Sequence, residues 1–527
     1  MAWWALLTLA ELEDRHGRAV IRIDGRQILV LQGASAIHAL PNRCPHEGYP
    51  LSEGTLSQGC VLTCNWHNWK FDLESGETLV GGDRVERFPV RIEGGQVLAD
   101  LAPPDPALRV REVLANIEQA LERADEQRLV RETARLVRLG ADPLDAVRTA
   151  IAWAPERMEF GMTHALAGAP DWLALHDKAA PGSAERLAAL GEILGHVADD
   201  AQEARRRFPY AEGAAPWDEA AFLDAIERED ETAALRLVRG ALEAGIPVAA
   251  LAPVLDAAAL AHYADFGHAL IYAVKAVELL DRLGPGPAGP LLAMLVRALV
   301  MAPREDLLPE FRDYASRLAG WGAAIGEASA PDAAALERVS ARSAMARVAS
   351  WGTVHPPEQV FAVLVEAAAR ILLRVEAAAL SRVDAPLAEN VSWLDFTHAL
   401  TFAEAGLVAV RRRPSLWPNL LLQLACFVGR NAGFADPGLD ERAFAVPDPA
   451  RFFDAEEQAL LDHGQGEFII SVHLLKTLRA GRALALHLPA LASLLAAALN
   501  RFLHAPPAKR RHVLRTAHQM RDLVAAE

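Results

Sequence analysis

Two cysteines and two histidines lie close together near the start of this 527-residue chain. Cys44 and His46 are separated by one residue and Cys64 and His67 by two, with seventeen residues between the pairs. Thiolates and imidazoles are the side chains that bind soft and borderline metal ions. The spacing therefore predicts a metal centre held by two loops, and the same four side chains would satisfy a tetrahedral zinc ion.

The residues around these ligand candidates favour an iron–sulfur centre over zinc. RCPHEG at 43–48 and CNWHNWKFDLESG at 64–76 closely resemble the two loops of the Rieske family, which hold a [2Fe–2S] cluster at the tip of a small β domain. The resemblance implies that Cys44 and Cys64 bind the inner iron and that His46 and His67 bind the outer iron.

The resemblance also bears on the redox potential. Two neutral imidazoles raise the potential of a cluster over that of an all-cysteine cluster. Respiratory-complex Rieske proteins add a disulfide and hydroxyl donors in these loops, where this chain has Tyr49, Trp66, Trp69 and Phe71. Because hydrogen bonds to the sulfurs stabilise the reduced cluster, we expect a low potential, as in ferredoxins and ring-hydroxylating oxygenases.

Strand patterns surround the two loops. Short apolar runs alternate with turn residues from Ala19 to Asp100, which predicts a small antiparallel sheet or barrel. Three prolines between 103 and 106 favour an extended linker over 103–108. The sequence thus predicts an all-β Rieske-type domain over 1–102. Cys60 and Cys426 match no ligand position and are predicted to be buried thiols. The predicted strands are RAVIRID, QILVL, CVLTC, WKFDL, FPVRI and QVLAD.

After the linker the apolar period becomes that of an α-helix. Leu, Val, Ile and Ala recur every three or four residues, and Gly- or Pro-containing segments interrupt them. The pattern predicts a large all-α domain over 109–527, in one bundle or two sub-bundles. The predicted breaks fall at 140–143, 245–247, 284–290, 302–305, 355–357, 411–414 and 434–440.

Four histidines of this region lie in similar apolar segments. FGMTHAL, DFGHAL, DFTHAL and ISVHLL carry one histidine each. Two of the segments contain D-x-x-H, which on a helix places a carboxylate and an imidazole on one face, one turn apart. The set predicts a catalytic pair on each of two helices and a second metal site, although single core histidines are commonly satisfied by one hydrogen bond. The candidates are Asp265, His268, Asp395 and His398 as catalytic residues, His164 and His473 as further metal ligands, and Glu159, Glu404 and Glu467 as additional carboxylates.

Several classes of function are disfavoured. The net charge of −16 argues against a nucleic-acid partner. The chain has no convincing signal peptide and no uninterrupted apolar segment of bilayer length, so we expect a cytoplasmic protein. Neither G-x-G-x-x-G nor G-x-x-x-x-G-K-[ST] occurs in a fitting context, so the electrons must come from a ferredoxin or a flavin reductase.

Two functional hypotheses follow. In the first, the chain is an oxidoreductase whose cluster passes single electrons to a site in the helical domain, where a non-haem iron would support O₂-dependent oxygenation of a small apolar substrate. In the second, the chain is an electron-transfer module, and the helical domain is a docking or oligomerisation scaffold. The D-x-x-H-x-x-x-x-H run of the ring-hydroxylating oxygenases is absent, so the resemblance to that family stops at about residue 103.

Overall fold

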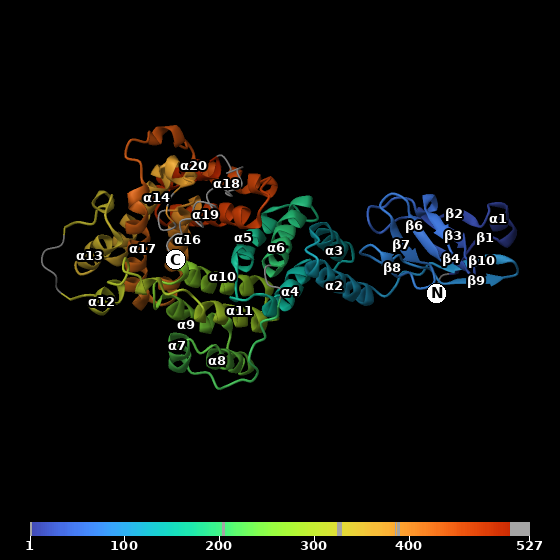
Figure 1. Cartoon of the computed structure of the whole chain (residues 1–527), viewed down its shortest axis with the longest axis horizontal. Helices are drawn as coiled ribbons and strands as arrows, with labels where there is room; N and C mark the ends of the chain where they lie inside the picture. The colour runs from blue at the N-terminus through green and yellow to red at the C-terminus, as the bar shows by residue number, and fades with distance from the viewer. Residues whose placement is uncertain (1–2, 203–205, 324–328, 385, 387–389, 506–527) are drawn as a thin grey trace. The chain divides into compact units, whose positions relative to one another are not determined.

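The structure is a computed structural model that describes residues 3–202, 206–323, 329–384, 386 and 390–505. It divides into two compact units, Met1–Glu112 and Val113–Glu527 (Figure 1). The first unit is built from β-strands and the second from helices. This confirms the predicted fold class, a small all-β domain followed by a large all-α domain.

Three small antiparallel sheets form the first unit. Their strand orders are β1-β10-β9, β2-β3-β4 and β5-β6-β7-β8. The six expected strands correspond to β2, β3, β6, β7, β9 and β10, whereas the other four had no recognisable pattern. The strands are β1 (Trp3–Thr8), β2 (Arg18–Ile23), β3 (Arg26–Gln32), β4 (Ile37–Pro41), β5 (Thr55–Ser57), β6 (Val61–Cys64), β7 (Trp69–Asp72), β8 (Thr78–Val80), β9 (Val90–Glu93) and β10 (Gln96–Asp100), and the short helix α1 (Leu9–Asp14) follows β1.

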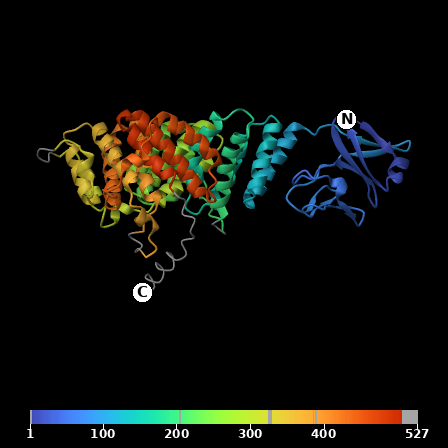
Figure 2. The same cartoon turned by 90° about the horizontal axis from the view of Figure 1, so that it is seen from above.

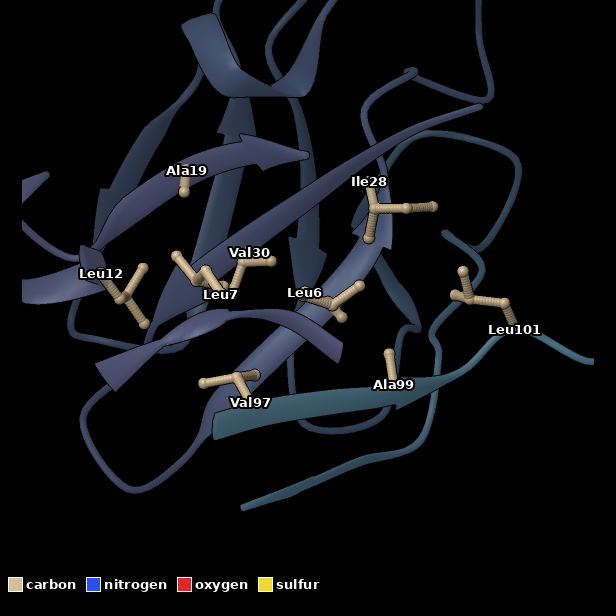
Figure 3. Packing of buried hydrophobic residues seen from close by; sticks show 10 residues of the cluster. Leu6, Leu7, Leu12, Ala19, Ile28, Val30, Val97, Ala99 and Leu101 are labelled. Carbon is tan, nitrogen blue, oxygen red and sulfur yellow. The ribbon is translucent and has the colours of Figure 1, made fainter. Parts of the chain in front are cut away.

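Two apolar clusters stabilise these sheets. Leu6, Val30 and Val97 belong to the first cluster, which joins β1 and β10 to β2 and β3 (Figure 3). Cys44 and Cys64 belong to the second, together with leucines of β3, β4 and β6. The second cluster therefore lies beneath the two loops that carry Cys44 and Cys64.

Each of the seven predicted breaks overlaps or adjoins the end of a helix in the second unit, whereas other helix ends, such as the one at Glu122, had no predicted break. One difference concerns the linker, because residues 106–108 already form the first turn of a helix. The helices are α2 (Pro106–Glu122), α3 (Glu126–Arg138), α4 (Leu144–Trp153), α5 (His164–Lys178), α6 (Ala184–Gln202), α7 (Glu219–Glu227), α8 (Glu231–Glu243), α9 (Val248–Leu260), α10 (His268–Leu283), α11 (Ala288–Val300), α12 (Tyr314–Ala319), α13 (Ala341–Trp351), α14 (Pro357–Arg374), α15 (Ala377–Ser381), α16 (Trp393–Arg412), α17 (Trp417–Asn431), α18 (Pro449–Ala459), α19 (Phe468–His487) and α20 (Ala492–Leu503).

Four of these helices form the centre of the helical unit. α5 packs on α10 and α19, and α16 packs on the same two helices, which closes a ring. Other helices, among them α6, α9, α17 and α20, pack against the ring from outside (Figures 1 and 2). Among the described residues, no helix is long and apolar enough to cross a bilayer.

Two candidate metal centres

The first candidate centre lies on two loops of the β unit. Cys44 follows β4, and its loop is closed by two hydrogen bonds, from its own amide to the Tyr49 carbonyl (2.8 Å) and from the Gly48 amide to the Cys44 carbonyl (2.9 Å). Gly48 has φ +79°, a conformation that costs a residue without Cβ little. Cys64 ends β6 and pairs with Trp69 of β7 across the second loop.

The two loops bring the four expected ligands together, with different exposure. Both thiols are buried, whereas 40 % of the His67 side chain and 21 % of the His46 side chain are exposed. The two imidazole rings lie edge to face with centroids 4.7 Å apart. Thiols therefore point inward and imidazoles outward, as expected of a cluster with an inner and an outer iron.

Charge and aromatic groups surround this centre. Burial, together with the neighbouring Cys64 thiol, raises the pKa of the Cys44 thiol to about 11, so binding of a metal must displace its proton. The Glu47 carboxylate lies 3.6 Å from Nε2 of His67 and 3.9 Å from Nε2 of His46. Trp69 stacks on His46. Outside the centre, Cys60 is only half-buried, contrary to expectation, and Cys426 is buried as expected.

The second candidate centre lies inside the ring of four helices. His164 is the first residue of α5 and His268 the first of α10, while His398 and His473 lie in the second turns of α16 and α19. Nε2 of His268 is 3.0 Å from Nε2 of His164 and 2.8 Å from Nε2 of His398. The His473 ring lies 4.8 Å from the His164 ring and 5.2 Å from the His398 ring, centroid to centroid.

The outer nitrogen of each imidazole has its own partner. Nδ1 of His398 donates to the Leu394 carbonyl (2.5 Å), and Nδ1 of His473 donates to the Ile469 carbonyl (2.6 Å). Each of these hydrogen bonds leaves Nε2 as the unprotonated nitrogen, the form that binds a metal. In the rings of His164 and His268, a polar side chain lies beside Nδ1. These contacts are Tyr272 Oη at 3.3 Å from His164 and Asp265 Oδ1 at 3.5 Å from His268.

This arrangement fits a metal ion. Nε2 of His473 is buried and has no hydrogen-bond partner among the described residues. Nitrogens bound to one ion at about 2.0–2.1 Å lie no more than about 4.2 Å apart, and the nitrogen contacts of His268 with His164 and His398 are within that limit. Imidazole donors suit iron, zinc, copper and nickel.

The environment keeps three of these imidazoles uncharged. Burial, followed by the positive charge of Lys476, holds the pKa of His164 and of His473 well below its usual range. Burial and the neighbouring His268 do the same for the pKa of His398. Neutral imidazole is the ligand form, so these residues are ready to bind a metal at neutral pH without losing a proton.

A layer of charged side chains lies farther along the same four helices. Nζ of Lys275 on α10 is 3.3 Å from Asp171 Oδ1 on α5 and 4.0 Å from Glu404 Oε2 on α16. Nε of Arg479 on α19 donates to Asp171 Oδ1 at 2.9 Å. Since every helix reaches this layer after its histidine, all four run parallel, and their positive N-terminal ends face the histidines. Such ends favour an anionic ligand there.

The carboxylates expected at the second centre lie elsewhere, with one exception. Asp395 Oδ2 accepts from the amide (2.8 Å) and the hydroxyl (3.0 Å) of Ser392, in the capping box that begins α16. Asp265 stays near His268, but as part of a 3₁₀ turn before α10 rather than on its helical face. Of the additional candidates, Glu404 belongs to the charged layer, Glu159 pairs with Arg206, and Glu467 is the N-cap residue of α19.

Sequence reasoning also missed several residues at this centre. Tyr272 and Lys476 lie one turn after His268 and His473, a spacing that could have identified them. On each helix the residue of the charged layer follows the histidine by six or seven residues, so helical spacing could have identified this layer too. Nothing in the sequence indicated the backbone turn before His268.

Comparisons with known proteins concern the β unit. The model of the Rieske [2Fe-2S] domain family matches residues 2–86. The ferredoxin component of the alkene monooxygenase system of Xanthobacter autotrophicus is 32% identical over 85 residues, which cover 16% of this chain and 70% of that protein. The methanesulfonate monooxygenase ferredoxin subunit of Methylosulfonomonas methylovora is 32% identical over 103 residues, covering 19% and 83%.

A longer relative is similar to this chain over only part of its own length. The 4beta-methylsterol monooxygenase of Methylococcus capsulatus is 33% identical over 118 residues, which cover 20% of this chain and 31% of that protein. The chain thus spans about a third of this monooxygenase, and the similarity supports an electron-transfer function of the Rieske type. Through its N-terminal domain, the chain belongs to the Rieske [2Fe-2S] family.

Proposed function

We propose that the chain is a Rieske-linked oxidoreductase in which the N-terminal domain supplies single electrons to an iron site in the helical unit. Cys44, Cys64, His46 and His67 would hold the [2Fe–2S] cluster, which supplies one-electron transfer when bound. The exposed edges of His46 and His67 are where a partner would approach. That partner is a ferredoxin or a flavin reductase, since the chain has no nucleotide-binding motif of its own.

The observation that carries this proposal is the convergence of four imidazoles inside the helical unit. These histidines, His164, His268, His398 and His473, come from four helices. They are joined by two direct nitrogen contacts and four ring contacts, and His398 and His473 are buried. A scaffold has no need for such a cluster, because neutral imidazoles that present unprotonated nitrogens to one another gain nothing without a shared proton or ion. A non-haem iron bound there would supply O₂ activation.

The surroundings of the four histidines support an apolar organic substrate. The Phe266 ring lies 5.0 Å from the His398 ring and 5.2 Å from the Phe427 ring, and Phe402 lies 5.2 Å from Phe427, centroid to centroid. Aromatic side chains packed in this way exclude water and would offer apolar contacts to such a substrate. Asp265 would act as a positioning group, holding Nδ1 of His268 so that Nε2 faces the metal. A cytoplasmic location, which keeps thiols reduced, is part of the proposal.

Metal analysis of the full chain tests the proposal. After anaerobic reconstitution, we expect one iron per chain beyond the two of the cluster. The additional iron should be absent from a His268→Ala, His398→Ala double variant that still assembles its cluster. A His196→Ala variant is the matched control, since His196 is a buried helical histidine outside the site.

The alternative is an electron-transfer module with a helical scaffold. It is favoured by the ferredoxin components among the relatives, of which the chain covers 70% and 83%. Iron analysis separates the two functions, because the module requires only the two irons of the cluster, with the same content in the double variant.

A further inference from the structure

The backbone before α10 takes a strained course. Asp265, Phe266 and Gly267 have φ values of +48°, +50° and +81° in succession. Glycine adopts such values freely and aspartate with modest difficulty, but a bulky aromatic residue does so rarely. Residues other than glycine are strained in this region and persist there only where the surrounding structure holds them.

A second segment holds this turn by three hydrogen bonds. The Asp265 amide donates to the Pro303 carbonyl, and the Asp306 amide donates to the Tyr263 carbonyl, both at 2.9 Å. The Phe266 amide donates to Oε2 of Glu305, also at 2.9 Å. Of these three hydrogen bonds, only the one to Glu305 has a side-chain acceptor, and its donor is the amide of Phe266, the most strained residue of the turn.

The turn places the central imidazole of the second metal centre. His268 follows directly as the first residue of α10, and its Nε2 contacts both His164 and His398. A Cβ on Gly267 would lie 2.8 Å from Phe402 and 2.9 Å from Phe427, so the turn has no room to relax at that position. The position of His268 therefore depends on how firmly residues 265–267 are held.

We propose that Glu305 is a positioning residue of the helical metal site, which fixes His268 through its hydrogen bond to the Phe266 amide. This inference rests on the proposed function, because it assumes that His268 binds a metal. Glu305 touches no imidazole in the described structure. Glu305 acts on the backbone at Phe266, two residues before the ligand His268. Groups that do not bind the metal themselves but orient its ligands have a similar role at other metal sites.

Cobalt(II) binding to the anaerobic full chain with its cluster oxidised tests the role of Glu305. The oxidised cluster is EPR-silent, so the cobalt signal reports the helical site alone. We expect Glu305→Ala to lower cobalt affinity by about 10- to 100-fold and to change the EPR signal. Glu305→Gln keeps a carbonyl oxygen as acceptor and should bind within about threefold of the wild type, with the same signal.

Glu366→Ala is the matched control, since Glu366 is a half-buried carboxylate on α14 that pairs with Arg370 and does not contact the turn. Wild-type affinity and signal in Glu305→Ala would overturn the inference. So would an equal loss in Glu305→Gln and Glu305→Ala, because it would show that charge matters rather than the hydrogen bond. If Glu305→Ala unfolds, Glu305→Met replaces it, because methionine keeps the length of the side chain and removes the oxygen acceptor; the same loss of cobalt affinity is expected, and wild-type affinity would overturn the inference.

Hydrogen exchange of the metal-free chain separates this inference from the proposed function. Glu305→Ala should speed exchange of the amides in residues 263–268 while α5 and α16 keep wild-type protection. Unchanged exchange in 263–268 contradicts the positioning role whatever the metal result. A wild-type chain that binds no cobalt overturns the proposed function instead, with the exchange result still showing whether Glu305 holds the turn.

Discussion

The two candidate centres of this chain are built in opposite ways. Cys44, His46, Cys64 and His67 come from two neighbouring loops of one β unit, with the imidazoles partly exposed. The four histidines of the helical unit come from distant parts of the chain, with 104 residues between His164 and His268 and 130 between His268 and His398. His398 and His473 are buried, and 14 % of the His268 side chain is exposed. The first arrangement leaves two imidazole edges open to solvent, whereas the second surrounds its imidazoles with packed helices.

The two centres obtain their ligand geometry from different kinds of contact, local at the first and tertiary at the second. Hairpin hydrogen bonds fix the loops of the first centre, so a short local sequence suffices to specify it. The second centre depends on packing of a helix ring, on Nδ1 partners and on a strained turn, all of which are tertiary. Substitutions should therefore act locally at the first centre and through the fold at the second.

Loss of one thiolate should produce the largest effect. Cys64→Ser is expected to abolish assembly of the cluster, because the inner iron loses one of its two thiolates. Iron and acid-labile sulfide analysis should show loss of both cluster irons and of the sulfide, while the helical iron remains. Cys60→Ser, a half-buried thiol four residues earlier, should keep the full content. A visible cluster in Cys64→Ser would contradict the ligand assignment.

Loss of one imidazole should affect only the second centre, in the helical unit. His398→Ala is expected to remove the helical iron and to leave the cluster spectrum unchanged. We expect affinity for iron to fall by more than the roughly 10- to 100-fold that loss of an outer-shell group costs. The His196→Ala control should retain iron, and retention of the helical iron in His398→Ala would refute the four-histidine site.

The buried charged layer should make the helical unit respond to pH. Burial raises the pKa of Glu404 to about 7, from 4.5 in the unfolded chain, despite the nearby Lys275. The folded chain thus binds more protons between these values, and stability falls as pH rises from 4.5 to 7. Glu404→Gln removes this loss, so its stability relative to the wild type should be greater at pH 8 than at pH 4.5.

The expected difference is at most about 3 kcal/mol, from about 1.4 kcal/mol for each pH unit in the window. Asp171 and Glu278 remain to neutralise Lys275 in this variant. Urea denaturation at the two pH values measures the effect, with Glu366→Gln as the control. An equal change in unfolding free energy at both pH values would show that Glu404 has no raised pKa.

The smallest effect should separate the two D-x-x-H aspartates. Asp395→Ala removes the acidic partner of Ser392 from the capping box of α16 and is expected to cost about 0.3–1.5 kcal/mol of stability without changing iron affinity. Asp265→Ala should weaken iron binding by about 10- to 100-fold, because Nδ1 of His268 loses its carboxylate. Thermal unfolding measures the stability of the two variants, and iron titration measures their iron affinity. Equal iron affinities in the two variants would remove the distinction.

Particular residues show how far the sequence could predict this structure. The Rieske loops were recognisable because their ligands and turns are local, and the four histidines because similar apolar segments carry them. The role of Asp395 could not be predicted, because a D-x-x-H run looks the same whether the aspartate binds a metal or caps a helix. The left-handed turn at Phe266 has no sequence signal, because its surroundings impose it.

Reoxidation of the reduced cluster tests the central claim most directly. The full chain is reduced without oxygen, mixed with oxygenated buffer and followed by the visible absorption of the cluster. We expect the wild type to reoxidise several-fold faster than a His398→Ala variant with an intact cluster, because electrons would leave through the proposed helical iron. Identical rates in the two proteins would contradict electron transfer from the Rieske domain to the four-histidine site.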